Sequence, residues 1–218
     1  MSAVPAGYRL LPSASPFNEL VGPLHERRSE GSISLGLRGS GNFPTGQFSQ
    51  TDQAAASSTV IQGAKSGFGY GLDAALSLGF IGVYAGFDHV QFDCETTTCQ
   101  SDGKYTLQGV TAGVKLAMPS VSLLHPYLKG GVTFNNLQGG YGGQSSNVLT
   151  ADRAPGYEVG VGADVSFLGI LSFSPQVRYI GQNLKAKIPG VSAPAPTGTA
   201  VNYVTADLGL SLHTPFGR

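Results

Sequence analysis

Two pairs of residues in this sequence stand close enough along the chain for catalysis. Ser211 and His213 are two positions apart, so in a strand they share one face, and a hydroxyl beside an imidazole is used for acyl transfer. Asp88 and His89 are adjacent, and adjacent residues of a strand point to opposite faces. The alternatives for Ser211 and His213 are a hydrolytic site and a polar pair in the interior of the fold. We favour the polar pair and expect no catalytic residues.

The two cysteines, Cys94 and Cys99, are separated by four residues. This spacing, without a second cysteine pair or a nearby histidine, makes a poor zinc site. No group of Asp and Glu residues has the spacing of a calcium loop. In an oxidising compartment the two thiols would close a short loop, worth roughly 2 kcal/mol in the chain-entropy model. We therefore expect a disulfide in such a compartment, and no metal or cofactor.

Nine charged residues are spread over the alternating segments of the sequence, about one to a segment. Four are positive and five negative: Arg38, Lys115, Lys129 and Arg178, and Asp73, Asp88, Glu158, Asp164 and Asp207. Because an unpaired buried charge is costly, this near balance is what a closed interior would need. We expect these nine side chains to form a network of ion pairs inside the fold.

The segments that carry these charges alternate strictly between apolar and small or polar residues. In YEVGVGADVSF (157–167) one set is Tyr157, Val159, Val161, Ala163, Val165 and Phe167, and the other is Glu158, Gly160, Gly162, Asp164 and Ser166. A period of two predicts a β-strand. The same test predicts eight strands, at residues 32–40, 67–78, 81–90, 106–118, 125–134, 157–167, 171–180 and 202–213. Pro175, in the middle of the seventh, predicts a bulge.

The connections between these segments are alternately short and long. Short ones follow the second, fourth and sixth strands, whereas residues 42–66, 93–104, 138–156 and 185–201 form long polar loops. In an up-and-down meander, alternate connections lie at the same end of the sheet. The pattern therefore predicts an all-β, eight-stranded antiparallel barrel with tight turns and both termini at one end, and long loops at the other.

The polar faces indicate which side of the barrel is outside. They are dominated by Gly, Ser, Ala and Thr, which suit the crowded interior of an eight-stranded barrel better than a surface in water. The apolar faces would then contact lipid, between two girdles of aromatic residues: Phe68, Tyr70, Phe80, Tyr157, Phe167, Phe173 and Tyr179. Charged residues make up only 12% of the chain, and the mean hydropathy is +0.04, as expected when apolar residues alternate. The formal net charge of zero does not favour nucleic acid as a partner.

These features resemble the small outer-membrane β-barrel superfamily, the OmpA, OmpX and OmpW kind, over residues 32–216. The likeness rests on the eight-strand meander, on GVGAD (160–164) and on PYLKGGVTF (126–134). The segment from Tyr203 to Phe216 is also similar to the family's C-terminal assembly signal, although Pro215 interrupts the alternation and Gly217 and Arg218 follow. The resemblance implies a transmembrane barrel in the bacterial outer membrane with both termini periplasmic.

The resemblance also bears on the domains and the function. Residues 1–31 would be a partly disordered periplasmic tail, 32–216 the barrel and 217–218 a short extension. Some barrels of this size are lipid A deacylases, which carry His and Ser two apart with an acid nearby, but His25, His89, His125 and His213 lack that arrangement. We expect a non-enzymatic barrel, closed by side chains, with a structural or surface-interaction role. The alternatives are a narrow OmpW-like porin for small or apolar solutes, and a soluble ligand-binding barrel.

The expected partners are outer-membrane lipids and lipopolysaccharide. The tail or the long loops would supply a contact surface for a protein partner. We expect no nucleic acid partner.

Overall fold

The computed structural model describes residues 31–50, 61–94, 103–120, 123–140, 148–167, 170–187 and 198–216. Nine strands form a single antiparallel sheet, and one short 3₁₀ helix, η1, spans Gly46–Phe48. The strands are β1 (Gly31–Thr45), β2 (Ala64–Leu78), β3 (Ile81–Cys94), β4 (Lys104–Ala117), β5 (Leu124–Gly140), β6 (Val148–Phe167), β7 (Leu171–Leu184), β8 (Ala186–Lys187) and β9 (Thr199–Phe216). No helix in this part of the chain is long and apolar enough to cross a membrane.

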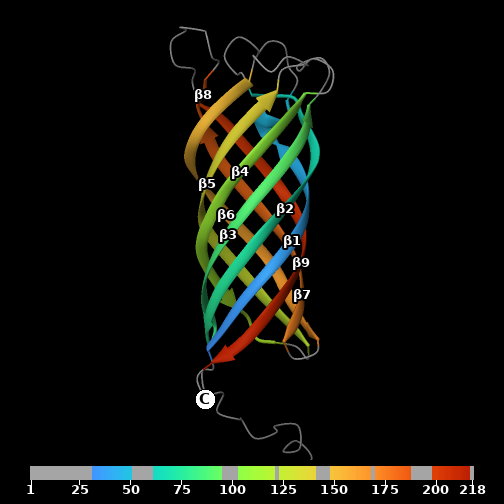
Figure 1. Ribbon diagram of the computed structural model, residues 1–218, viewed down its shortest axis with the longest axis vertical. Helices are drawn as coiled ribbons and strands as arrows, with labels where there is room; N and C mark the ends of the chain where they lie inside the picture. Colours follow the sequence, from blue (N-terminus) through green and yellow to red (C-terminus); the bar gives the residue numbers. More distant parts are fainter. Residues whose placement is uncertain are drawn as a thin grey trace, which may run out of the picture.

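The sheet closes on itself as a tall barrel of tilted strands (Figure 1). Each strand pairs with the next from β1 to β7, and β9 pairs with both β7 and β1. The two-residue β8 pairs only with β6, so eight strands form the wall. The predicted eight-stranded, antiparallel, up-and-down barrel is therefore confirmed.

The two ends of the barrel differ. We call the end that holds the β2–β3 turn at Gly79 and Phe80 the turn-side end, and the opposite end the loop-side end. Gly31 of β1 pairs with Phe216 of β9 at the turn-side end, so the barrel begins and finishes there (Figure 1). Residues 1–30, 217 and 218 lie outside the described residues, and the predicted tail and extension stay predictions.

An apolar belt covers the outer wall over the turn-side and middle parts of the barrel. Its side chains project from every wall strand, and many are about half exposed or more: Leu35, Leu37, Leu72, Val83, Val114, Leu128, Val132, Val159, Val161, Val177, Leu208 and Leu210. The opposite positions of the same strands point inward, where Arg38, Glu158 and Arg178 are buried. The expected sidedness, with apolar residues outside and charged residues inside, is thus present in this part of the barrel.

Towards the loop-side end the sidedness inverts. The outward positions of β3 run Ile81, Val83, Ala85, Phe87 and then His89, Gln91, Asp93, while the inward ones run Tyr84, Gly86, Asp88 and then Val90, Phe92. The cross-strand register shows the same change between two successive outward-facing rows of paired residues. Leu72, Phe87, Val110 and Phe134 form one outward row, and Tyr70, His89, Gln108 and Asn136 form the next row. We call the part of the barrel beyond the second row the cap.

The cap is built from strand extensions that were predicted from the sequence to be loops. β1 continues to Thr45, β5 to Gly140, and β6 already begins at Val148, inside the predicted 138–156 loop. The predicted loop bounds were wrong. In these extensions the polar residues face outward and the apolar ones inward, and Gly and Asn interrupt the alternation, so the sequence resembles an irregular polar loop.

Pro175 does not produce the predicted bulge. The β6–β7 register is the same on both sides of it, from Gly162↔Gln176 to Val165↔Phe173, and only the intervening pairs are missing. Proline has no N–H to donate, so the ladder lapses locally without an inserted residue. The register shifts occur instead in the cap, between Ala64 and Gly67 of β2 and between Asn135 and Leu137 of β5.

Candidate functional site

Arg178 of β7 is the centre of a group of ion pairs that crosses the barrel interior. Its Nε and Nη2 donate to the two carboxylate oxygens of Asp207, at 2.7 and 2.9 Å. Its Nη1 donates to Glu158 Oε2 at 2.8 Å, and Nη1 and Nη2 reach Asp88 at 3.3 and 3.2 Å. Arg178 is only 1% exposed. A planar guanidinium with five donors suits such shared binding of carboxylates.

Two further cations extend this group. Arg38 of β1 pairs with Asp73 of β2, and with Asp88 at 2.7 Å, so Asp88 bridges both arginines. Lys129 of β5 pairs with Glu158 at 3.0 Å. We call these seven residues the lumen charge cluster: Arg38, Asp73, Asp88, Lys129, Glu158, Arg178 and Asp207. It connects every wall strand except β4 through side chains, and its charges nearly cancel.

The other two predicted charges form a separate pair nearer the turn-side end. Lys115 Nζ of β4 lies 2.6 Å from Asp164 Oδ2 of β6, and Ser174 Oγ donates to Asp164 Oδ1 at 2.7 Å. Lys115 also lies 3.8 Å from the ring centroid of Tyr127, a cation–π contact. All nine predicted charges thus project into the interior, but as one cluster of seven and one pair.

Glycines give these large side chains their space. A Cβ atom on Gly160 would lie 2.9 Å from Cγ of Arg178, and one on Gly162 would lie 2.6 Å from the hydroxyl of Tyr127. Tyr84 fills the same region and donates to Glu158 Oε1 at 2.9 Å. The glycines of the inner faces therefore leave room for arginine and tyrosine side chains on neighbouring strands. The two tyrosines were placed on inner faces by the alternation, but their role was missed.

A second interior layer, which the sequence analysis missed, fills the cap. Buried apolar side chains from seven strands, from η1 and from the segment before β2 pack together there. We call this group the cap core: Phe48, Ile61, Ala64, Val90, Phe92, Tyr105, Leu107, Leu137, Ala151, Ile180, Leu184, Val201 and Tyr203. The rings of Phe48 and Tyr203 pack against that of Phe92 at centroid distances of 5.1 and 5.3 Å. The sequence did contain a signal for this layer. Every second residue of β3 faces inward, and this alternation continues from Asp88 to Val90 and Phe92.

The residue pairs first considered for catalysis have structural surroundings. Ser211 Oγ and His213 Nε2 are 3.0 Å apart on the inner face of β9, both half-buried. His89 is on the outer wall, stacked on Tyr70 and hydrogen-bonded to Gln108 at 2.9 Å, whereas Asp88 is in the lumen charge cluster. Within the described residues, no group of three or more His, Cys, Asp or Glu side chains is placed to hold a metal ion.

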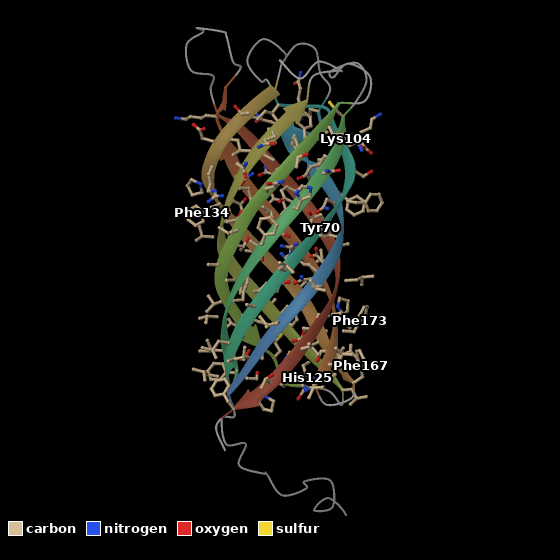
Figure 2. The ribbon with its side chains drawn as sticks, in the orientation of Figure 1. Tyr70, Lys104, His125, Phe134, Phe167 and Phe173 are labelled. Carbon is tan, nitrogen blue, oxygen red and sulfur yellow. The ribbon has the colours of Figure 1, made fainter. Side chains whose placement is uncertain are left out.

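The predicted girdle residues all lie on the outer wall. Phe68, Tyr70, Phe80, Tyr157, Phe167 and Phe173 are exposed and Tyr179 is partly so. Figure 2 shows Tyr70 at one level of the wall together with Phe134, which the prediction omitted, and Phe167 and Phe173 nearer the turn-side end. Lys104 lies beyond the upper level, in the cap. Cys94 ends β3, but Cys99 lies outside the described residues, so the disulfide stays a prediction.

Comparison with solved structures finds this architecture in outer-membrane proteins. OprG from Pseudomonas aeruginosa matches 85% of this chain and 97% of its own, at 14% identity and a TM-score of 0.58. The chain of Neisserial surface protein A (NspA) matches 84% of this chain and 96% of its own, at 14% identity and 0.55. AlkL, solved in lipid bilayers, matches 87% and 91%, at 13% identity and 0.51. The chain has the fold of the small outer-membrane β-barrels. No protein-family model matches its sequence, and no curated protein does.

Proposed function

We propose that this chain is a non-enzymatic, integral β-barrel of the bacterial outer membrane, with a closed lumen and a structural or surface-interaction role. The apolar belt supports the membrane location, since an exposed surface of this extent is suited to lipid. The belt is also opposite in sidedness to a soluble ligand-binding barrel. In the proposed orientation, turns and both termini face the periplasm, and the cap stands in water outside.

The observation that carries the closed lumen is the lumen charge cluster. Glu158, Arg178 and Asp207 are each no more than 2% exposed, and their ion pairs join strands on different sides of the wall. A small solute would have to separate several buried ion pairs to pass. Because breaking such a pair leaves uncompensated buried charge, at a cost of about 3–5 kcal/mol, the cluster acts as a fixed plug.

Planar-bilayer recordings test this function. The purified protein should insert without producing stepwise conductance, and an Arg38→Ala/Arg178→Ala variant that remains folded should show more frequent openings. Regular conductance steps from the unsubstituted protein would overturn the closed lumen.

A second candidate function is a route for apolar solutes. The observation that favours it is the cap core, which places apolar side chains such as Phe92 and Leu107 above the charged layer. Liposomes carrying the protein would then take up an apolar fluorescent dye faster than empty liposomes. Equal rates would leave the structural role as the function.

A further inference from the structure

The turn-side end of the lumen contains a polar cavity that the proposed function does not use. Its volume is about 200 Å³, and we call it the vestibule. Its inner-face lining comes from the turn-side ends of the wall strands, and Figure 2 shows His125 at this end of the barrel, far from Lys104. A smaller cavity of about 70 Å³ shares Lys115, Asp164 and His213 with it and leads towards Lys129. Several lining side chains are half-buried, so water reaches the vestibule.

Hydrogen-bond donors predominate in the vestibule. Hydroxyl groups line it on four strands: Ser32, Ser34, Ser77, Ser166 and Ser172. Its charged and titratable side chains are Lys115 of β4, His125 of β5, Asp164 of β6 and His213 of β9. The single carboxylate is already satisfied, since Lys115 and Ser174 each bond one oxygen of Asp164. Among the described lining residues there are therefore many donors and no free carboxylate.

The two histidines retain bonding capacity towards the cavity. His213 bonds to Ser211 through Nε2, and no described residue bonds its Nδ1. Among the described residues, His125 makes one long polar contact of 3.4 Å, between Nδ1 and the carbonyl oxygen of Asp164. Because Lys115 and Asp164 neutralise each other, the charge of the vestibule depends on these two imidazoles. Protonation of both makes its net charge positive.

We propose that the vestibule binds a small oxyanion of the phosphate or sulfate class, held by His125 and His213 and by the surrounding serine hydroxyls. The cavity holds such an anion with several waters, given about 30 Å³ for each water. Charge-assisted hydrogen bonds from imidazolium to an oxyanion are stronger than neutral ones. Binding is therefore coupled to proton uptake by the imidazoles and weakens as the pH rises. The anion enters from the water at the turn-side end, because the wall separates the cavity from lipid.

Calorimetric titration with inorganic phosphate tests this site. The full chain is used in a maltoside detergent, which carries no phosphate, at about pH 5.5 and about pH 7.5. We expect saturable binding of one phosphate at the lower pH and at least about tenfold weaker binding at the higher pH. Absence of saturable binding at the lower pH, or equal affinity at both, overturns the proposal.

Substitutions locate the site. His125→Gln/His213→Gln should abolish the low-pH binding, while His89→Gln, on the outer wall, should leave it unchanged. If the double variant does not fold, each single glutamine variant should weaken binding at least about threefold and reduce its pH dependence. The assignment is overturned if the folded double variant, or the folded single variants, bind phosphate with full affinity. Loss of binding in His89→Gln also overturns it. The test does not depend on conductance, so it succeeds or fails independently of the closed lumen.

Discussion

At the scale of single residues, Arg178 contributes more to the interior than its one charge implies. It bonds carboxylates from three other strands, Asp88 of β3, Glu158 of β6 and Asp207 of β9. The alternation of the sequence was enough to identify these residues as inward-facing charges. It could not show which residue pairs with which, because pairing across a barrel depends on the stagger of the strands.

Replacing Arg178 by alanine should destabilise the barrel by about 3–5 kcal/mol, since three carboxylates lose a buried partner. Urea unfolding in detergent micelles, followed by circular dichroism, measures this change. Arg153→Ala is the control, because Arg153 is exposed on the outer wall of the cap and should shift the midpoint little. Equal midpoints for the two variants would contradict a structural role for the cluster.

Alanine at Gly162 should destabilise the barrel by about 1–3 kcal/mol, the usual cost of overpacking. The added methyl would meet the Tyr127 hydroxyl and the Cβ of Gln176 at 2.6 and 2.7 Å. Gly39→Ala is the matched control, since a Cβ there meets no atom within 4 Å. The same unfolding assay applies, and a loss at Gly39 as large as at Gly162 would refute the packing explanation.

At the scale of elements, each strand has two parts of opposite sidedness. The membrane-facing part was predicted well because its alternation is regular: the strand predicted at 81–90 is β3, which runs from Ile81 to Cys94. The cap part was missed because its apolar residues face the interior and its polar residues face outward, the reverse of the membrane-facing part. Val90 and Phe92 are inside, and Gln91 is outside. In the proposed membrane location, the point of inversion marks where the medium around the wall changes from lipid to water.

This inversion predicts different reactivity at two outward positions of the same strand. In a Cys94→Ser/Cys99→Ser background in lipid vesicles, a charged maleimide should label Gln91→Cys rapidly and Val83→Cys very slowly. Both side chains point outward, so the difference reports the surrounding medium alone. Similar labelling rates would show that the cap and the belt are in the same medium.

At the scale of the whole molecule, a closed wall of paired strands surrounds two different interiors. The lumen charge cluster fills the membrane-facing part, and the cap core fills the cap. Each layer is matched to the outer surface at its own level: buried charges lie behind the apolar belt, and buried apolar residues lie behind a largely polar surface, in which Phe43 and Phe68 are exposed. In the proposed membrane location, each layer of the interior would face the medium that its outer surface suits.

The intact barrel should resist denaturation by sodium dodecyl sulfate at room temperature. Unheated samples should migrate faster in a denaturing gel than boiled ones, because a closed hydrogen-bonded wall stays compact until heat opens it. Removal of detergent should cause aggregation through the apolar belt. A protein that stays monomeric in detergent-free buffer would contradict the membrane assignment.

The pairing of Gly31 with Phe216 has a consequence for biogenesis. The seam of the barrel joins β1 to β9, so it forms only after β9 has arrived. Before that, β1 and β7 would each have an unpaired edge, and unsatisfied backbone groups are costly in lipid. A truncated or stalled chain is thus an open sheet that favours pairing with any other strand nearby. Quality control of this protein should therefore depend on delivery of its C-terminal strand.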